Sequence, residues 1–374
     1  MNFDFSDDQK FLKSEARKFL EANCPTTSAR KVLEEDGKAF DEGLWKSVAG
    51  QGWLGAAIPE EHGGLGLGHL ELCVIAEELG RSVAPIPFAS TVYFLAEAIM
   101  LAGTAEQKAD LLPKIAAGEV IGAVATSEGP GVVTAGNLQA TVTDGKLNGT
   151  KIPVTDGDIA NVALVLAKEN GKAGLYIVDM ADASVTKEAV KTLDPSRDAA
   201  KLIFKNTPVR RLGAAGEGFE LVERIFDRAA VLLSFEQTGG ADRCLEMAKE
   251  YALERYAFGR VIASYQAIKH KLADMYVKNE LARSNAYYGA WALNTDAPEL
   301  PVAASAARIA ASEAFWFASK ENIQTHGGIG FTWEMDCHLF YRRSRQLSLV
   351  AGAPRVWKER LVSHLERRNA AAAA

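Results

Sequence analysis

The chain has 374 residues, of which 48% are hydrophobic and 24% are charged, a composition typical of a globular protein with two or three packed units. Its net charge of -6 excludes a protein that binds nucleic acid through a broad basic surface. The four cysteines are far apart, and no apolar run is long enough to span a bilayer. We therefore expect a cytoplasmic protein with reduced thiols and no membrane span.

The first segment, residues 1–119, is predicted to be helical. Ser6 and Gln9 have the spacing of a capping box, which satisfies free amides at the start of a helix. The apolar residues of the first helix then share one face, namely Phe11, Leu12, Ala16, Phe19 and Leu20. The pattern predicts further helices within 43–54, 69–83 and 94–118, and the glycine-rich stretch 58–68 is predicted to be a loop.

The middle segment, residues 120–215, has short β-like runs in place of the helical period. Turn signals at Asp144-Gly145 and Asn170-Gly171 separate neighbouring runs, which is typical of antiparallel hairpins. The helical period returns over 216–374, so the fold class is α+β with a small antiparallel barrel or sandwich in the middle. The runs cover residues 120–126, 138–143, 146–155, 161–168, 174–180 and 200–206.

Two motifs in the last segment suit a nucleotide. Arg255 and Phe258 lie three apart on a predicted helix, so a guanidinium and an aromatic ring would share a face, as a pyrophosphate next to an adenine requires. A surface ion pair of Arg255 with a neighbouring carboxylate is the alternative. The glycines of the segment Gln324–Gly330 would let backbone amides approach a phosphate, although such a run alone is more often a turn.

Four features in this order resemble the flavin-dependent acyl-CoA dehydrogenase family over nearly the whole chain. They are the Pro59–Gly66 glycine loop, the α-β-α order, the RxxFG of Arg255–Gly259 and the QxxGGxG of Gln324–Gly330. The resemblance implies an N-terminal helical domain (1–119), a middle β domain (120–215) and a C-terminal four-helix bundle (216–374). It also implies FAD as cofactor, an acyl-CoA substrate, an electron-transferring flavoprotein as electron acceptor, and a homotetramer or a heterotetramer with a related subunit.

The same resemblance assigns cofactor-binding residues. Ser127, in TSEGPGVVTAGN, and Thr155, in KIPVTDG, stand where residues that face the isoalloxazine ring are expected. Pro153 occupies the place of an aromatic residue that usually covers this ring. The residues implied around the adenosine and pyrophosphate are Arg255, Phe258, Gln266, Gln324, Gly327 and Gly328.

A catalytic base is missing from both places where the family carries it. Ala351 falls at the usual glutamate, and Ala229 falls at a second known position on the long helix before RxxFG. Glu236 lies two helical turns after Ala229 and interrupts an apolar run, where an ionisable side chain is otherwise unexpected. We therefore predict Glu236 as the base, because a carboxylate in apolar surroundings suits removal of the α-proton. The alternative is that Glu236 pairs with a basic residue or faces solvent.

The predicted function is FAD-dependent α,β-dehydrogenation of an acyl-CoA thioester, with room for a bulky acyl group such as a fatty acid or a steroid side chain. One alternative is a non-catalytic or partly degenerate partner subunit of a heterotetrameric acyl-CoA dehydrogenase. Another retains the flavin but eliminates a group without net oxidation. No metal is predicted, because His270 and His326 have no second ligand at a suitable spacing.

Overall fold

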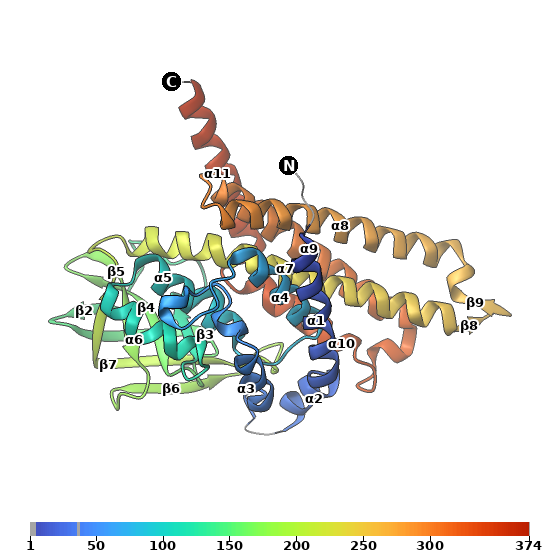
Figure 1. Cartoon of the computed structure of the whole chain (residues 1–374), viewed down its shortest axis with the longest axis horizontal. Helices are drawn as coiled ribbons and strands as arrows, with labels where there is room; N and C mark the ends of the chain where they lie inside the picture. Colours follow the sequence, from blue (N-terminus) through green and yellow to red (C-terminus); the bar gives the residue numbers. More distant parts are fainter. Residues whose placement is uncertain (1–4, 36–37, 374) are drawn as a thin grey trace. The chain divides into compact units, whose positions relative to one another are not determined.

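The computed structural model describes residues 5–35 and 38–373 (Figure 1). The chain forms two compact units, each assembled from separate stretches of sequence. One unit comprises Met1–Lys31, His69–Ala84 and Ala230–Ala374, and the other comprises Val32–Gly68 and Pro85–Ala229. The element order is helices, then a sheet, then helices, as the sequence predicts.

Helix α1 (Asp7–Asn23) opens the first unit and packs against α4 (His69–Arg81). The predicted capping box is confirmed: the Gln9 amide donates to Ser6 Oγ at 3.2 Å, and the Ser6 amide donates to Gln9 Oε1 at 3.0 Å. Helix α2 (Thr26–Glu34) follows α1 and was not predicted, since its nine residues are too few to show a clear apolar period.

Five helices form the C-terminal half of the chain. They are α7 (Gly218–Glu254), α8 (Gln266–Asn294), α9 (Leu300–His326), α10 (Cys337–Leu349) and α11 (Pro354–Ala373). Helix α9 contacts α8, α10 and α11. Small buried side chains at Ala282, Ala311 and Ala314 allow α8 and α9 to approach closely.

The second unit is built on a seven-stranded sheet. Most pairs are antiparallel, as predicted, but β4 lies parallel to β1 and to β2. The chain passes through β3 between β2 and β4, and through β2 and β3 between β1 and β4, as parallel neighbours require a crossover rather than a tight turn. The strands are β1 (Gly122–Ala125), β2 (Thr141–Thr143), β3 (Lys146–Thr155), β4 (Val162–Glu169), β5 (Lys172–Asp179), β6 (Val185–Val190) and β7 (Ala199–Leu212).

Two hairpin turns fix the register of the sheet. Asp144 and Gly145 have φ of 50° and 70°, and Asn170 and Gly171 have φ of 52° and 78°, as two-residue turns with matched twist require. Both predicted turns are therefore confirmed. Strand β6 was not predicted, because its alternate side chains are exposed and polar and give it no apolar face.

The remaining helices of the second unit lie before the sheet in sequence. They are α3 (Glu42–Gly50), a π-helical stretch (Ala89–Ala96), α5 (Glu97–Ala102) and α6 (Ala105–Ala116). The predicted glycine loop 58–68 is irregular apart from one short 3-10 turn, Glu60–His62. A Cβ on Gly64 would lie 2.0 Å from the Ile58 carbonyl oxygen, so the loop folds back on itself at a position that only glycine allows.

Candidate active site

Glu236 lies in the middle of α7 and is 4% exposed. Its neighbours Leu233 and Phe235 are fully buried, as the apolar run predicts. Arg343 of α10 is its ionic partner, with Nη1 4.0 Å from Glu236 Oε1. The same guanidinium donates hydrogen bonds to the carbonyl oxygens of Val83 and Ala84 at 3.3 and 3.2 Å. The pairing with a basic residue that the sequence left open is thus present, inside the first unit.

A second buried guanidinium, Arg308 of α9, lies near the same carboxylate. Burial lowers the pKa of Arg308 to about 9, and the charge of Glu236 acts in the opposite direction. At neutral pH Arg308 therefore carries its proton. It donates to the side-chain oxygen of Gln237 and to the Leu347 carbonyl, and to the Val350 carbonyl at 2.7 Å.

These contacts fix the turn that carries Ala351. Arg308 holds the carbonyls at the end of α10, and Trp357 Nε1 donates to the Ala351 carbonyl at 3.1 Å. Ala351 and Gly352 have φ of 62° and 102°, so the chain makes a left-handed turn between α10 and α11. A non-glycine residue in this conformation costs of the order of 1 kcal/mol, which the anchoring contacts offset.

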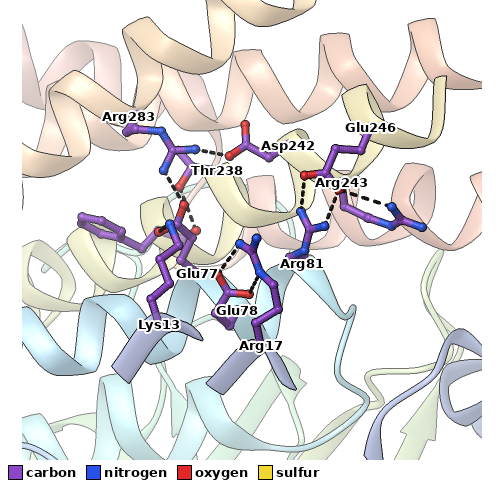
Figure 2. A network of polar contacts seen from close by, with 11 residues as sticks. Lys13, Arg17, Glu77, Glu78, Arg81, Thr238, Asp242, Arg243, Glu246 and Arg283 are labelled. Atoms are coloured by element: carbon purple, nitrogen blue, oxygen red, sulfur yellow. Dashed lines mark hydrogen bonds and ion pairs between the residues drawn. The ribbon is translucent and has the colours of Figure 1, made fainter. Parts of the chain in front are cut away.

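Two buried carboxylates on α4 are also paired with cations (Figure 2). Glu77 binds Lys13 at 2.6 Å and also Arg283, and Glu78 binds Arg17 at 2.8 Å. Burial raises the pKa of Glu77, but the charges of Arg283 and Lys13 outweigh it and hold that pKa below its usual value. We interpret this network as a structural clamp between helices.

The RxxFG motif does not lie on one helix, so the expectation that Arg255 and Phe258 share a helical face is wrong. Helix α7 ends at Glu254, and the chain continues as a hairpin of β8 (Tyr256–Ala257) and β9 (Arg260–Val261). Phe258 and Gly259 form its tight turn, with φ of 52° and 81°. A glycine after Phe258 ends the helical period, and the ring at the tip is 97% exposed.

The glycine motif after α9 divides into two parts. A Cβ on Gly327 or Gly328 would meet no atom within 4 Å, whereas one on Gly330 would lie 2.5 Å from the Ile323 carbonyl oxygen. The first two glycines therefore present open backbone, and the third is required by packing. Gln324 and Gln266, at the end of α9 and the start of α8, are exposed, as is Arg255. The Gly327 amide donates to the Gln324 carbonyl as the cap of α9. Backbone without side chains, a guanidinium and an exposed ring are groups that could contact an adenosine diphosphate group.

His326 precedes these glycines and has its own contacts within the unit. Its ring stacks on Tyr251 with centroids 4.3 Å apart, and Nδ1 lies 2.9 Å from the Asn322 carbonyl oxygen. Burial lowers the pKa of His326. In the part of the chain that the structure describes, no group of three or more potential ligands could hold a metal ion.

Ser127 and Thr155 belong to the second unit and lie on connected segments. The Ile152 amide donates to the Ser127 carbonyl at 3.0 Å, and Glu128 and Ile152 form an isolated parallel bridge. Thr155 ends β3 and pairs with Ala199. Both side chains are partly exposed. Ser127 Oγ donates to the Gly129 carbonyl at 3.2 Å. Partly exposed hydroxyls on connected segments could hydrogen-bond a flavin ring.

Two buried ion pairs close to these segments were not predicted from the sequence. Lys151 is fully buried in β3 and binds Glu128, and Asp156 is buried against Arg197 with Nη2 2.7 Å from Oδ2. A signal was available at Lys151, since it stands at an inward position of an alternating strand. The partners could not be identified, because they come from other segments.

Both ends of the chain match models of the same protein family. Residues 6–119 match the model of the acyl-CoA dehydrogenase N-terminal domain, and residues 216–365 match that of the C-terminal domain. The acyl-CoA dehydrogenase IpdE2 of Mycobacterium tuberculosis is 33% identical over 96% of this chain and 98% of its own length.

Two solved structures with similar folds are named by two different chains. A variant of the Tcur3481-Tcur3483 steroid ACAD is 32% identical with a TM-score of 0.88, and covers 97% of this chain and 99% of its own. The ChsE4-ChsE5 complex from Mycobacterium tuberculosis is 25% identical with a TM-score of 0.89, and covers 98% and 99%. No helix among the described residues is long and apolar enough to cross a membrane.

Proposed function

This chain belongs to the acyl-CoA dehydrogenase family and is an oxidoreductase, and from that premise we propose that it oxidises an acyl-CoA thioester to the α,β-unsaturated thioester with FAD. An electron-transferring flavoprotein would then reoxidise the flavin. The observation that carries the proposal is the exposed set of Arg255, Phe258 and the open backbone at Gly327 and Gly328, whose chemistry fits a flavin nucleotide.

We assign the roles of the cofactor-binding residues as follows. Arg255 would pair with the pyrophosphate, Phe258 would cover the adenine, and the backbone at Gly327 and Gly328, which carries no side chain, would let phosphate oxygens approach closely. The side-chain amides of Gln266 and Gln324 would form hydrogen bonds at the adenosine and pyrophosphate end of FAD. The hydroxyls of Ser127 and Thr155 would hydrogen-bond the isoalloxazine ring. When bound, the flavin supplies the acceptor for the β-hydride.

Glu236 remains our proposed base for the α-proton. It is a buried carboxylate on α7 with fully buried apolar neighbours, and a carboxylate is a group that can accept the α-proton. For transfer, an oxygen of Glu236 must come within hydrogen-bond reach of the thioester α-carbon.

The test is anaerobic reduction of the flavin by acyl-CoA. The rate is measured in a stopped-flow instrument as the loss of flavin absorbance. Glu236→Gln should slow reduction by at least 100-fold, because an amide cannot accept the proton. Glu334→Gln, at an exposed carboxylate after the glycine motif, is the matched control and should reduce at the wild-type rate. Unchanged reduction in the Glu236 variant would exclude Glu236 as the base.

A second candidate is a partner subunit of a mixed tetramer in which another chain supplies the base. The observation that motivates it is the pairing of Glu236 with Arg343, together with alanine at positions 229 and 351. Two similar solved structures are described by pairs of chains, which supports the same candidate. A purified chain that alone is yellow, tetrameric and active would exclude it. Activity that appears only on co-expression with a related, glutamate-bearing chain would establish it.

We further propose that the acyl group is bulky. Ala351 replaces a glutamate expected from the family, so its position holds a methyl group in place of a longer side chain. The steroid ACAD among the similar structures supports a substrate of this size. Flavin reduction by a steroid side-chain CoA ester should therefore be at least tenfold more efficient than by butyryl-CoA, and the reverse preference would contradict this proposal.

A further inference from the structure

Lys151 presents an unusual feature of the second unit, because its side chain is 0% exposed yet carries an ammonium group. Its Nζ lies 2.8 Å from Glu128 Oε1 and 3.5 Å from the Thr126 carbonyl oxygen. Burial lowers the pKa of Lys151, and the hydrogen bond and charge of Glu128 oppose that shift. A buried charge is tolerated only when it is paired in this way.

Glu128 connects three segments of the chain. Besides Lys151 in β3, its carboxylate accepts hydrogen bonds from the amides of Gln139 and Ala140, at 2.7 and 2.9 Å, just before β2. Its own backbone forms the isolated bridge with Ile152. One carboxylate therefore holds the loop after β1, the start of β2 and the middle of β3 together.

Regular strand pairing supplies only part of this connection, through the isolated bridge between Glu128 and Ile152. The ladder between β3 and β7 is irregular between Lys151 and Val154, so the end of β3 that carries Thr155 follows a break in regular pairing. After Glu128 the loop is exposed and contains Gly129 and Gly131, around which a Cβ would meet no atom within 4 Å. The position of Ser127 relative to β3 is therefore set by one backbone hydrogen bond, from the Ile152 amide to the Ser127 carbonyl, together with the side-chain contacts at Glu128 and Lys151.

We propose that Glu128 and Lys151 are a positioning pair that sets the separation of Ser127 and Thr155, the two hydroxyls that would hydrogen-bond the isoalloxazine ring. Ser127 adjoins Glu128, and Thr155 lies four residues after Lys151 on the same strand. This inference rests on the proposed function, since it requires that the chain binds FAD. Neither side chain is proposed to touch the substrate.

The test compares a double variant with a matched control from the same sheet. Glu128→Gln with Lys151→Met removes both charges while keeping an oxygen for the two amides and an unbranched apolar stem. Glu188→Gln with Lys201→Met makes the same changes at an exposed pair between β6 and β7, where Nζ and Oε2 are 2.9 Å apart. FAD affinity is measured by fluorescence titration of apoprotein, and the flavin environment by visible absorption and circular dichroism.

The first double variant should bind FAD at least tenfold more weakly and show an altered visible circular dichroism band, whereas the control should match the wild type. Thermal unfolding of the apoproteins should differ by only a few degrees, because a buried ion pair contributes little net stability relative to neutral replacements. If the double variant does not fold, Glu128→Gln alone should show the same direction of change.

Two outcomes are distinguishable. An unchanged FAD dissociation constant together with an unchanged flavin spectrum in the variants would overturn the positioning role and leave the proposed function intact. A wild-type chain that binds no FAD would overturn the proposed function, and the positioning role with it.

Discussion

Four aspartates of the second unit lie close to one another. Asp198 lies near Asp156, Asp158 and Asp194, and burial together with these charges raises its pKa from 3.8 to about 6. Arg197 neutralises part of the cluster through Asp156. The folded protein therefore holds a proton on Asp198 at pH values where the unfolded chain has lost it.

This difference predicts a pH-dependent effect of Asp198→Asn. Between pH 4 and pH 6 the folded state binds more protons than the unfolded state, so rising pH removes stability from the wild type. The asparagine variant escapes that loss. Its melting temperature should equal that of the wild type near pH 4 and exceed it by about 2 °C above pH 6, as measured by thermal unfolding across the pH range.

Asp182→Asn provides a control of opposite sign. Hydrogen bonds from Ser184 lower the pKa of Asp182, so that carboxylate stabilises the folded state once the pH exceeds its unfolded value. The Asp182 variant should therefore become less stable than the wild type as pH rises. A melting-temperature difference that does not change with pH in the Asp198 variant would contradict the titration.

Residue-level prediction from sequence succeeded where one position carried its own signal. Glu236 was identified from its apolar neighbours, and its burial is confirmed. Its partner Arg343 was not identified, because a contact between α7 and α10 leaves no trace in local spacing. The same limit applies to Lys151, whose inward position was visible but whose partner Glu128 was not.

At the scale of elements, α4 and α7 cross at two glycines. A Cβ on Gly80 would lie 1.8 Å from the Glu236 carbonyl oxygen, and one on Gly239 would lie 1.8 Å from the Glu77 carbonyl oxygen. The backbones therefore touch, and the ion pairs shown in Figure 2 surround the same crossing. The position of Glu236 depends on this close approach.

Gly80→Ala should consequently destabilise the protein by about 3 kcal/mol or more, because a methyl group cannot fit without separating the helices. Thermal unfolding is the measurement. Gly50→Ala, at the end of α3 with no atom within 4 Å of the added Cβ, should be neutral or stabilising by up to about 1 kcal/mol. Equal melting temperatures for Gly80→Ala and the wild type would show that the helices can separate freely.

Elements with strong local chemistry were predictable from the sequence. The capping box of α1 and the two Asx-Gly hairpins are confirmed because each is encoded within four residues. The hairpin at Phe258 was mistaken for helix, since the helical period of α7 continues almost to its turn. The parallel position of β4 depends on a long crossover, and no local pattern encodes it.

At the scale of the whole molecule, the outer face of α8 is incompletely covered. Tyr276, Val277 and Leu281 are each more than half exposed. Exposed apolar residues gathered on one element favour association with another chain. This agrees with the tetramer implied by the family resemblance.

Leu281→Glu should therefore shift the protein from a tetramer toward smaller species, as measured by multi-angle light scattering. A charge buried at an interface without a partner is strongly unfavourable. Ser47→Glu, at an exposed polar position on α3 and not on α8, should leave the mass unchanged. A wild-type protein that is monomeric at micromolar concentration would contradict the prediction, whatever the variants do.

At the turn that carries Ala351, the contacts that hold the backbone are independent of the side chain at that position. Its left-handed conformation is maintained by Arg308, Gly352 and Trp357, and none of these contacts uses the side chain at position 351. The side chain at position 351 can therefore be changed without altering the contacts that hold the backbone of the turn. A proton acceptor can be removed there, restored there or placed on another helix while the surrounding architecture stays the same.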